Sequence, residues 1–146
     1  MHEPSAPPVR ISRTVETELA ADQLWELVGD GDAWTSWMVD EADVDIEPGA
    51  DGTVIDDGVR RNVRIDTVDR SERVVFTWWP HDRPEASSTV ELVVVPASPG
   101  SVLRIIETYG SAMAGGAAVT DWHVRALLLA VRAMLVTASS SVVAGA

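Results

Sequence analysis

The segment Asp121-Trp-His-Val-Arg-Ala-Leu-Leu-Leu-Ala-Val-Arg-Ala-Met-Leu-Val136 decides the expected fold. On a helix, its charged residues Asp121, Arg125 and Arg132 fall on one narrow stripe, and most of the remaining surface is apolar. A helix with so little polar surface must pack against a large apolar partner. The only candidate is a sheet formed by the strand-like sequence before it. The pattern therefore predicts one long helix, over 119–138, closing over a curved sheet.

Composition narrows the class of protein. The chain has 146 residues, the size of one domain, and 46% of them are hydrophobic, which indicates a globular core. It contains no Cys and no Lys, so disulfides, thiolate chemistry and Schiff-base lysines are excluded. The net charge of −12 disfavours nucleic acids and anionic membranes as partners. No signal peptide, membrane span, cofactor motif or metal-ligand set is visible, so a cytoplasmic protein without metal or cofactor is expected.

The first third of the chain predicts one strand and two short helices. Residues 9–19 alternate apolar with polar side chains, as a half-buried strand does. Helical spacing replaces this alternation over 20–28, and Gly29 ends the helix. Asp30 or Asp32 is expected to cap a second short helix. One face of that helix carries Trp34, Trp37 and Met38.

Six further strands are predicted without interruption. They cover residues 42–46, 53–56, 59–69, 73–79, 86–95 and 101–109. Asp57-Gly58 is a strong hairpin signal, and Pro96-Ala-Ser-Pro-Gly100 is a turn. Because short turns join consecutive strands, we expect an antiparallel meander. The expected fold class is therefore α+β with element order β-α-α-β6-α, a seven-stranded curved antiparallel sheet wrapped around the C-terminal helix with an internal cavity.

Several local strings resemble the START-like helix-grip superfamily, and within it the heat-shock-protein-90 ATPase activator-like branch with its small bacterial relatives. These strings are Ala20-Ala-Asp-Gln-Leu-Trp-Glu-Leu-Val28, Trp34, Trp37, Val68-Asp69 before Arg73-Val-Val-Phe-Thr-Trp78, Leu103-Arg-Ile-Ile-Glu-Thr108, and Trp122. The resemblance implies a sheet that grips the last helix around a cavity. Members of the superfamily bind lipids, hormones and polyketides, and some cyclise or dehydrate polyketides.

The resemblance also suggests domain limits. It covers residues 9–138, which form the predicted START-like domain. The Pro-rich tail 1–8 is expected to be disordered, and residues 139–146 are expected to fray. The expected partner is a small hydrophobic molecule, and the expected assembly is a monomer or a homodimer.

Tryptophan accounts for six of the eight aromatic residues, although Trp needs a partner for its N–H when buried. Trp37, Trp78 and Trp122 converge if the second helix, the fifth strand and the last helix meet at one end of the cavity. They then form either an aromatic wall for a planar ligand or a plug of the core. Trp79 points to the other sheet face and is expected at the surface or in a dimer contact. The predicted ligand-binding residues are Trp37, Met38, Phe76, Trp78, Leu92, Leu103, Ile105, Trp122, Ala126 and Met134.

Glu107 and His123 are the candidate catalytic residues. If Arg104 faces solvent, Glu107 faces the cavity, where desolvation raises the pKa of a carboxyl group unless it is paired. Glu107 then binds a ligand hydroxyl or acts as an acid–base group, or instead it sits in water at the strand end or pairs with an Arg. His123 lies on the inward side of the last helix. It is either satisfied by a backbone carbonyl or forms an acid–base pair with Glu107.

Arg60 and Arg61 place one guanidinium on each face of their strand. One of them either holds an anionic ligand group at the cavity mouth or forms a cross-strand pair with an Asp or Glu.

Three functions fit the sequence. The first is non-catalytic binding of a small hydrophobic molecule, aromatic or polyketide-like, with the segment 110–118 as part of a gate. The second is a polyketide cyclase- or dehydratase-like enzyme that uses Glu107 and His123. The third is a protein-interaction, co-chaperone-like module with an exposed patch near Trp79.

Overall fold

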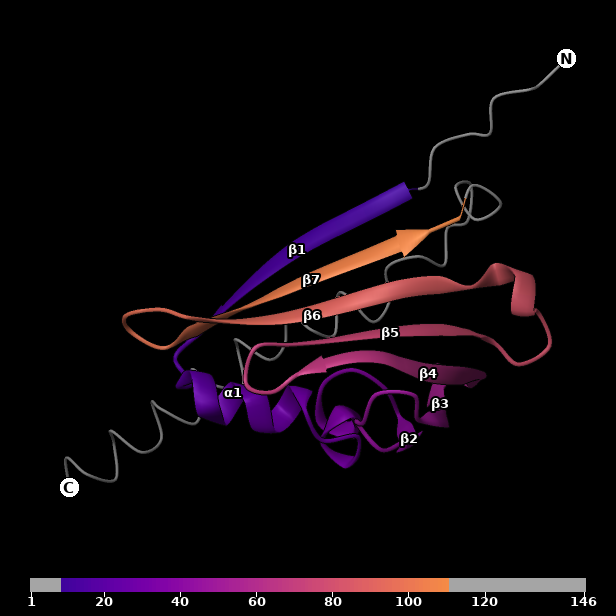
Figure 1. The fold of residues 1–146 in the computed structure, drawn as a ribbon, viewed down its shortest axis with the longest axis horizontal. Coiled ribbons are helices and arrows are strands. Elements are labelled where there is room, and N and C mark those ends of the chain that lie inside the picture. Colours follow the sequence, from indigo (N-terminus) through magenta and orange to yellow (C-terminus); the bar gives the residue numbers. More distant parts are fainter. Residues whose placement is uncertain (1–8, 111–146) are drawn as a thin grey trace, which may run out of the picture.

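The computed structural model describes residues 9–110, which form a seven-stranded antiparallel sheet with strand order β1-β7-β6-β5-β4-β3-β2 (Figure 1). The strands are β1 Val9–Thr17, β2 Glu41–Asp43, β3 Asp51–Asp56, β4 Val59–Asp69, β5 Arg73–Pro80, β6 Ser88–Pro96 and β7 Ser101–Tyr109. The helices are α1 Ala21–Val28 and the short 3-10 helices η1 Asp32–Ser36 and η2 Pro84–Ala86. The seven predicted strands and their antiparallel order are confirmed. The predicted helix over 119–138, both terminal segments and residues 111–118 lie outside the described residues.

The first and last strands of the sheet are neighbours. β1 pairs with β7 along its whole length, from Val9 opposite Tyr109 to Thr17 opposite Ser101. After β1 the chain forms α1 and η1 and then enters the sheet again at β2, the opposite edge. From β2 onward each strand pairs with the next one along the chain. This crossing places α1 against the sheet, where it contacts β6 and β7 (Figure 1).

The two faces of the sheet differ in burial. On β5, Val74, Phe76 and Trp78 are buried, whereas the intervening Val75 and Thr77 are half-buried. This period of two is that of a strand with one face on the core. We call the buried side the inner face, and α1 packs on it. The inner-face core of the described residues comprises Val15, Val54, Val63, Ile65, Val74, Phe76, Trp78, Val90, Leu92, Val94, Leu103 and Ile105.

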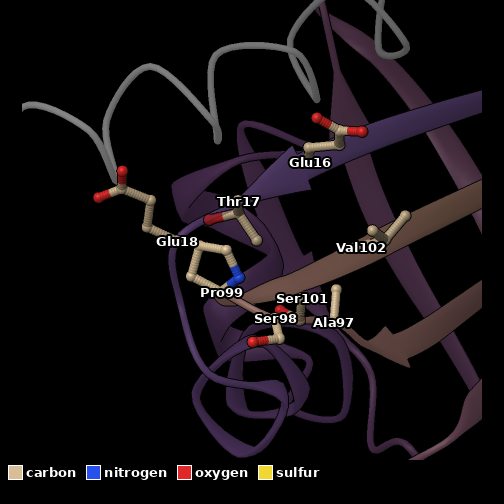
Figure 2. Close-up of a pocket in the computed structure, with 8 residues that line it drawn as sticks. All are labelled: Glu16, Thr17, Glu18, Ala97, Ser98, Pro99, Ser101 and Val102. Atoms are coloured by element: carbon tan, nitrogen blue, oxygen red, sulfur yellow. The ribbon is translucent and has the colours of Figure 1, made fainter.

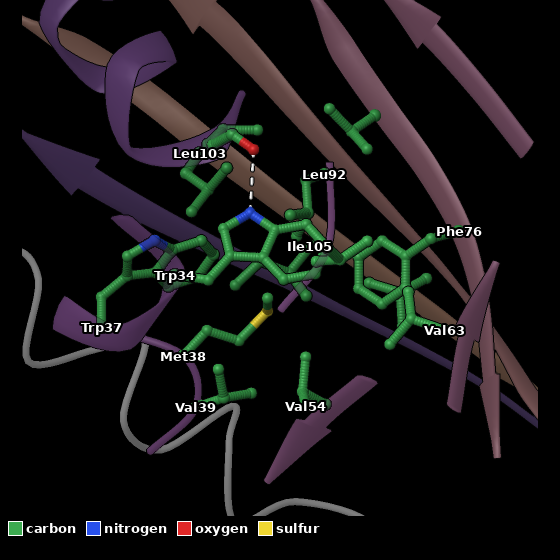
Figure 3. Packing of buried hydrophobic residues seen from close by; sticks show 14 of the residues in the cluster. Trp34, Trp37, Met38, Val39, Val54, Val63, Phe76, Leu92, Leu103 and Ile105 are labelled. Carbon is green, nitrogen blue, oxygen red and sulfur yellow. Dashed lines mark hydrogen bonds between the residues drawn. The ribbon is translucent and has the colours of Figure 1, made fainter. Parts of the chain in front are cut away.

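Two tryptophan side chains complete the end of α1. The last carbonyls of an α-helix have no partner within the helix. The indole N–H of Trp34 donates to the Val28 carbonyl at 2.9 Å, and that of Trp37 donates to the Leu27 carbonyl at 2.9 Å. Trp34 also packs on Phe76, with ring centroids 4.9 Å apart, so it ties the helix end to the sheet (Figure 3). This double role explains why these positions carry Trp rather than Phe.

Two local predictions need correction. The second helix is a 3-10 helix whose N-cap is Gly31, and neither predicted Asp is its cap residue, although Asp30 accepts a hydrogen bond from the Asp32 N–H at 3.0 Å. The strand predicted over 42–46 ends at Asp43. It ends early because the Glu47 N–H turns back to the Asp45 carbonyl, at 2.9 Å, so that segment makes a turn instead of a ladder.

Candidate functional site

Six polar or aromatic residues meet on the inner face near the end of β7. We call them the Glu107 cluster, and they are Asp56, Arg61, Trp78, Ser88, Glu107 and Tyr109. The sheet register brings them together: Trp78 pairs with Ser88, and Ser88 pairs with Tyr109 on the next strand. Glu107 is the next inner-face residue along β7. Five consecutive strands, β3 to β7, therefore contribute side chains to one place.

Glu107 is a fully buried carboxylate with several hydrogen-bond donors. Its side chain is 0% exposed, so the alternative that it sits in water at the strand end is wrong. Its Oε2 accepts a hydrogen bond from the Ser88 hydroxyl at 2.6 Å and one from the Trp78 indole N–H at 3.1 Å. The Trp78 N–H also donates to the Ser88 Oγ, at 2.9 Å. A length of 2.6 Å is that of a short O–H···O hydrogen bond.

Tyr109 adds a third donor. Burial, followed by the negative charge of Glu107 and the hydrogen bond to it, raises the pKa of the Tyr109 phenol above its usual value, and Arg61 opposes this in part. The phenol therefore keeps its proton at neutral pH. A neutral phenol that faces a carboxylate acts as a hydrogen-bond donor. The carboxylate of Glu107 is thus stabilised by three neutral donors, those of Trp78, Ser88 and Tyr109.

Arg61 provides the positive charge of the cluster. Its guanidinium carbon lies 4.6 Å from the ring centroid of Trp78, in cation–π geometry. Its Nη2 lies 3.7 Å from Oδ2 of the buried Asp56, which confirms the prediction that one of the two adjacent arginines pairs with a carboxylate. Arg60 is exposed, so the two side chains lie on opposite faces as expected.

The structure brings most of the predicted ligand-binding residues into one buried cluster. Figure 3 shows Trp34 among these residues, in a position that the prediction did not include. The predicted residues within the cluster are Trp37, Met38, Phe76, Trp78, Leu92, Leu103 and Ile105. The other predicted site residues, Trp122, His123, Ala126 and Met134, lie outside the described residues.

Sequence reasoning missed three members of the Glu107 cluster, namely Ser88, Tyr109 and Asp56. A single Ser or Tyr at a strand end carries no signal of its own. Their role follows from the register, which places Ser88 between Trp78 and Tyr109. The missed signal was the period of two on the last strand, because a Tyr two residues after Glu107 must share its face.

A hollow of about 370 Å³ opens at the other end of the sheet (Figure 2). It lies where β1 ends and β6 turns into β7, and Thr17 pairs there with Ser101. The Glu107 cluster lies at the opposite end of β7, so the two are separate features. The hollow is lined by Glu16, Thr17, Glu18, Ala97, Ser98, Pro99, Ser101 and Val102.

The part of the chain that the structure covers contains neither a metal-ligand group nor a membrane-spanning helix. Within residues 9–110, no three His, Asp or Glu side chains are placed to hold a metal ion. In the same range no helix is long and apolar enough to cross a membrane.

Comparison with protein families gives a match over most of the chain. The model of the family described as activator of Hsp90 ATPase homolog 1-like protein matches residues 18–125. No curated protein is significantly similar to this chain.

Solved structures share the fold. Protein BH1534 of Bacillus halodurans aligns with a TM-score of 0.67 at 17% identity, over 86% of this chain and 99% of that one. CalU16 of Micromonospora echinospora aligns with a TM-score of 0.57 at 19% identity, over 70% of this chain and 62% of that one. DynU16, described as a protein in the dynemicin biosynthetic locus, aligns with a TM-score of 0.66 at 18% identity, over 81% of this chain and 45% of that one. The aligned region therefore spans less than half of DynU16, and at these identities the likeness concerns the fold.

Proposed function

The chain belongs to the activator of Hsp90 ATPase homolog 1-like family, within the START-like superfamily, and we propose that it binds a small hydrophobic molecule without changing it chemically. The proposed ligand is aromatic or polyketide-like. It binds against the inner face of the sheet, in a cavity closed by the predicted helix over 119–138.

The observation that carries this proposal is the composition of the inner face. Its central part is apolar, with Phe76, Leu92 and Ile105 all fully buried. At one end lies a group of polar side chains, the Glu107 cluster. Small-molecule sites combine mostly apolar walls with a few polar groups that fix orientation. Burial of apolar ligand surface contributes about 25 cal/mol per Å² of affinity, and the cluster supplies orientation.

The relatives support a small-molecule role. A protein of the same fold, DynU16, is described as a protein in the dynemicin biosynthetic locus. Fold likeness alone does not define a function, so the proposal rests on the inner face of this chain.

The hydrogen bonds of Glu107 argue for binding rather than catalysis. A general acid must give up a proton, and a general base must take one, during each turnover. Three donors surround the Glu107 carboxyl group, and all three belong to buried side chains, those of Trp78, Ser88 and Tyr109. The Oε2 atom of Glu107 is therefore already occupied by donors of the protein itself.

An interaction module is less well supported. Such a surface needs a contiguous exposed apolar patch. Among residues 9–110 the large hydrophobic side chains that are more than a third exposed are Val59 and Val95, at 41% and 36%. Trp79, which the third hypothesis used, is half-buried.

Tryptophan fluorescence tests the proposal. The protein is titrated with a chemically broad panel of hydrophobic metabolites, flat polycyclic aromatics included. Trp78 and Trp79 are adjacent and lie on opposite faces, so Trp78→Phe and Trp79→Phe form a matched pair. A bound ligand should change the emission of the wild-type protein, and Trp78→Phe should reduce this change more than Trp79→Phe does. The proposal fails if no member of the panel changes the emission.

The Glu107→Gln variant separates binding from catalysis. For a binding protein, ligands should come back unchanged from a long incubation with either wild type or variant. Turnover by the wild type that is lost in Glu107→Gln would instead establish the enzyme.

A further inference from the structure

Arg61 carries a buried hydrogen-bond donor that no described residue satisfies. Its Nε is inaccessible to solvent and makes no hydrogen bond. Its Nη2 is 3.7 Å from the Asp56 carboxylate, which is longer than an N–H···O hydrogen bond. Leaving a buried donor unpaired is costly, and more so when it is charged. The guanidinium is therefore held in place by an ion pair and by the Trp78 ring, with the Nε–H unused.

Arg61 lies on the inner face of the sheet. It pairs with Val54 on one side and Pro80 on the other, both of which are buried. Its side chain is 19% exposed. Arg61 therefore places a fixed donor at one end of the inner face.

Extending the proposed function, on which this inference rests, we propose that Arg61 recognises the ligand by donating its Nε–H to a neutral oxygen acceptor. The ligand class is an aromatic ketone, quinone or ester, with its carbonyl oxygen at the Arg61 end of the site and its apolar body along the inner face.

The charges around Arg61 favour a neutral acceptor over an anion. The buried carboxylate of Asp56 already pairs with the guanidinium. A second buried carboxylate, Glu107, lies in the same cluster and is stabilised as an anion by its donors. Tyr109 keeps its proton and contributes no charge. Within the Glu107 cluster one cation therefore already faces two carboxyl groups, and a carboxylate ligand at this end would be repelled. A carbonyl oxygen accepts the hydrogen bond without that repulsion.

Three probes with the same ring frame test this inference: 9-fluorenone carries a carbonyl, fluorene carries no acceptor, and fluorene-9-carboxylate carries an anion. Their affinities are measured by tryptophan fluorescence and calorimetry. Wild type should bind fluorenone about tenfold more tightly than fluorene, which is the effect of one hydrogen bond to a charged donor. The carboxylate should bind more weakly than fluorenone.

The matched variants are Arg61→Met and Arg60→Met. Arg61→Met should lose the preference for fluorenone over fluorene. Arg60→Met removes an exposed guanidinium on the other face and should keep the preference. A preference that persists in Arg61→Met would overturn the inference while leaving the proposed function standing. Wild-type preference for the carboxylate would overturn it in the same way. Failure of all three probes to bind wild type would count against both the inference and the proposed function.

A second measurement does not depend on any variant's affinity. The arginine Nε–H signals of the ¹⁵N-labelled wild type are recorded by NMR, and the Arg61 signal is assigned by its loss in Arg61→Met. Fluorenone should shift this signal, and fluorene should shift it much less. Equal shifts with both probes would contradict a hydrogen bond to the carbonyl.

Discussion

The Ser88 hydroxyl, at the start of β6, donates to the Glu107 carboxylate on β7 at 2.6 Å, in an interior where Glu107 has no exposed surface. This contact joins two strands through side chains in addition to their backbone ladder. It also satisfies an oxygen of a buried carboxyl group. Because unpaired buried charge is costly, the structure depends on each donor around this carboxylate.

Replacing Ser88 should therefore destabilise the protein. Ser88→Ala removes a donor from a buried charged acceptor and should lower the free energy of unfolding by about 2 kcal/mol. Thr89→Val, the control, removes an exposed hydroxyl from the next position and should change it by less than about 0.5 kcal/mol. Urea denaturation measures both. Similar losses in the two variants would contradict the role given to Ser88.

The protein should lose stability at alkaline pH because the buried phenol of Tyr109 has to keep its proton in the folded state. Burial and the Glu107 charge raise the pKa of Tyr109 in the folded state, so the folded protein keeps a proton that the unfolded chain releases near pH 10. The stabilising contribution is complete below about pH 10 and decreases as pH rises toward the folded-state pKa, by about 1.4 kcal/mol per pH unit. Tyr109→Phe should flatten this decrease.

The composition allows the alkaline titration to be assigned to one residue. Tyr109 is the only tyrosine, and the chain contains no lysine that would titrate in the same range. Tyrosinate absorbance should therefore appear near pH 10 in urea and at higher pH in the folded protein. Coincident titration curves would show that the phenol is not held as described.

Replacing Trp34 should lower the free energy of unfolding more than replacing Trp79, which is half-buried on the outer face. Trp34→Phe leaves the Val28 carbonyl without its donor and opens a gap beside Phe76. The expected cost is about 3 kcal/mol. Trp79→Phe, on the outer face, should cost about 1 kcal/mol or less. Thermal and urea unfolding of both variants measure the difference, and equal costs would argue against the Trp34 packing.

Two turn glycines with similar backbone angles should respond differently to alanine. Gly58 has φ +76° with open space around an added Cβ, whereas Gly100 has φ +79° with the Thr17 carbonyl oxygen 2.1 Å from that position. Gly58→Ala should cost about 1 kcal/mol from backbone strain alone. Gly100→Ala should cost clearly more, because β1 would have to move. Equal unfolding free energies would show that the β6–β7 turn does not pack on β1 in this way.

Much of the secondary structure could be predicted because it follows from the spacing of neighbouring residues and from turn residues. The hairpin at Asp57-Gly58 has positive φ at both residues, as that dipeptide favours, and the strand over 59–69 matches β4. The alternation that turns Arg104 outward also turned Glu107 inward. Such predictions succeed because the period of two depends only on neighbouring residues.

The arrangement of the Glu107 cluster depended on the tertiary structure. The sequence by itself determined the strands, their meander and which face each side chain takes, because those properties follow from spacing and turn chemistry within about ten residues. Only the fold decided that Ser88 and Tyr109 meet Glu107 and that Arg61 stacks on Trp78. The Ser88–Glu107 and Arg61–Trp78 contacts each cross from one strand to the next, so spacing within a single strand does not define them. Their geometry is set by register and sheet curvature, which result from the packing of the whole core.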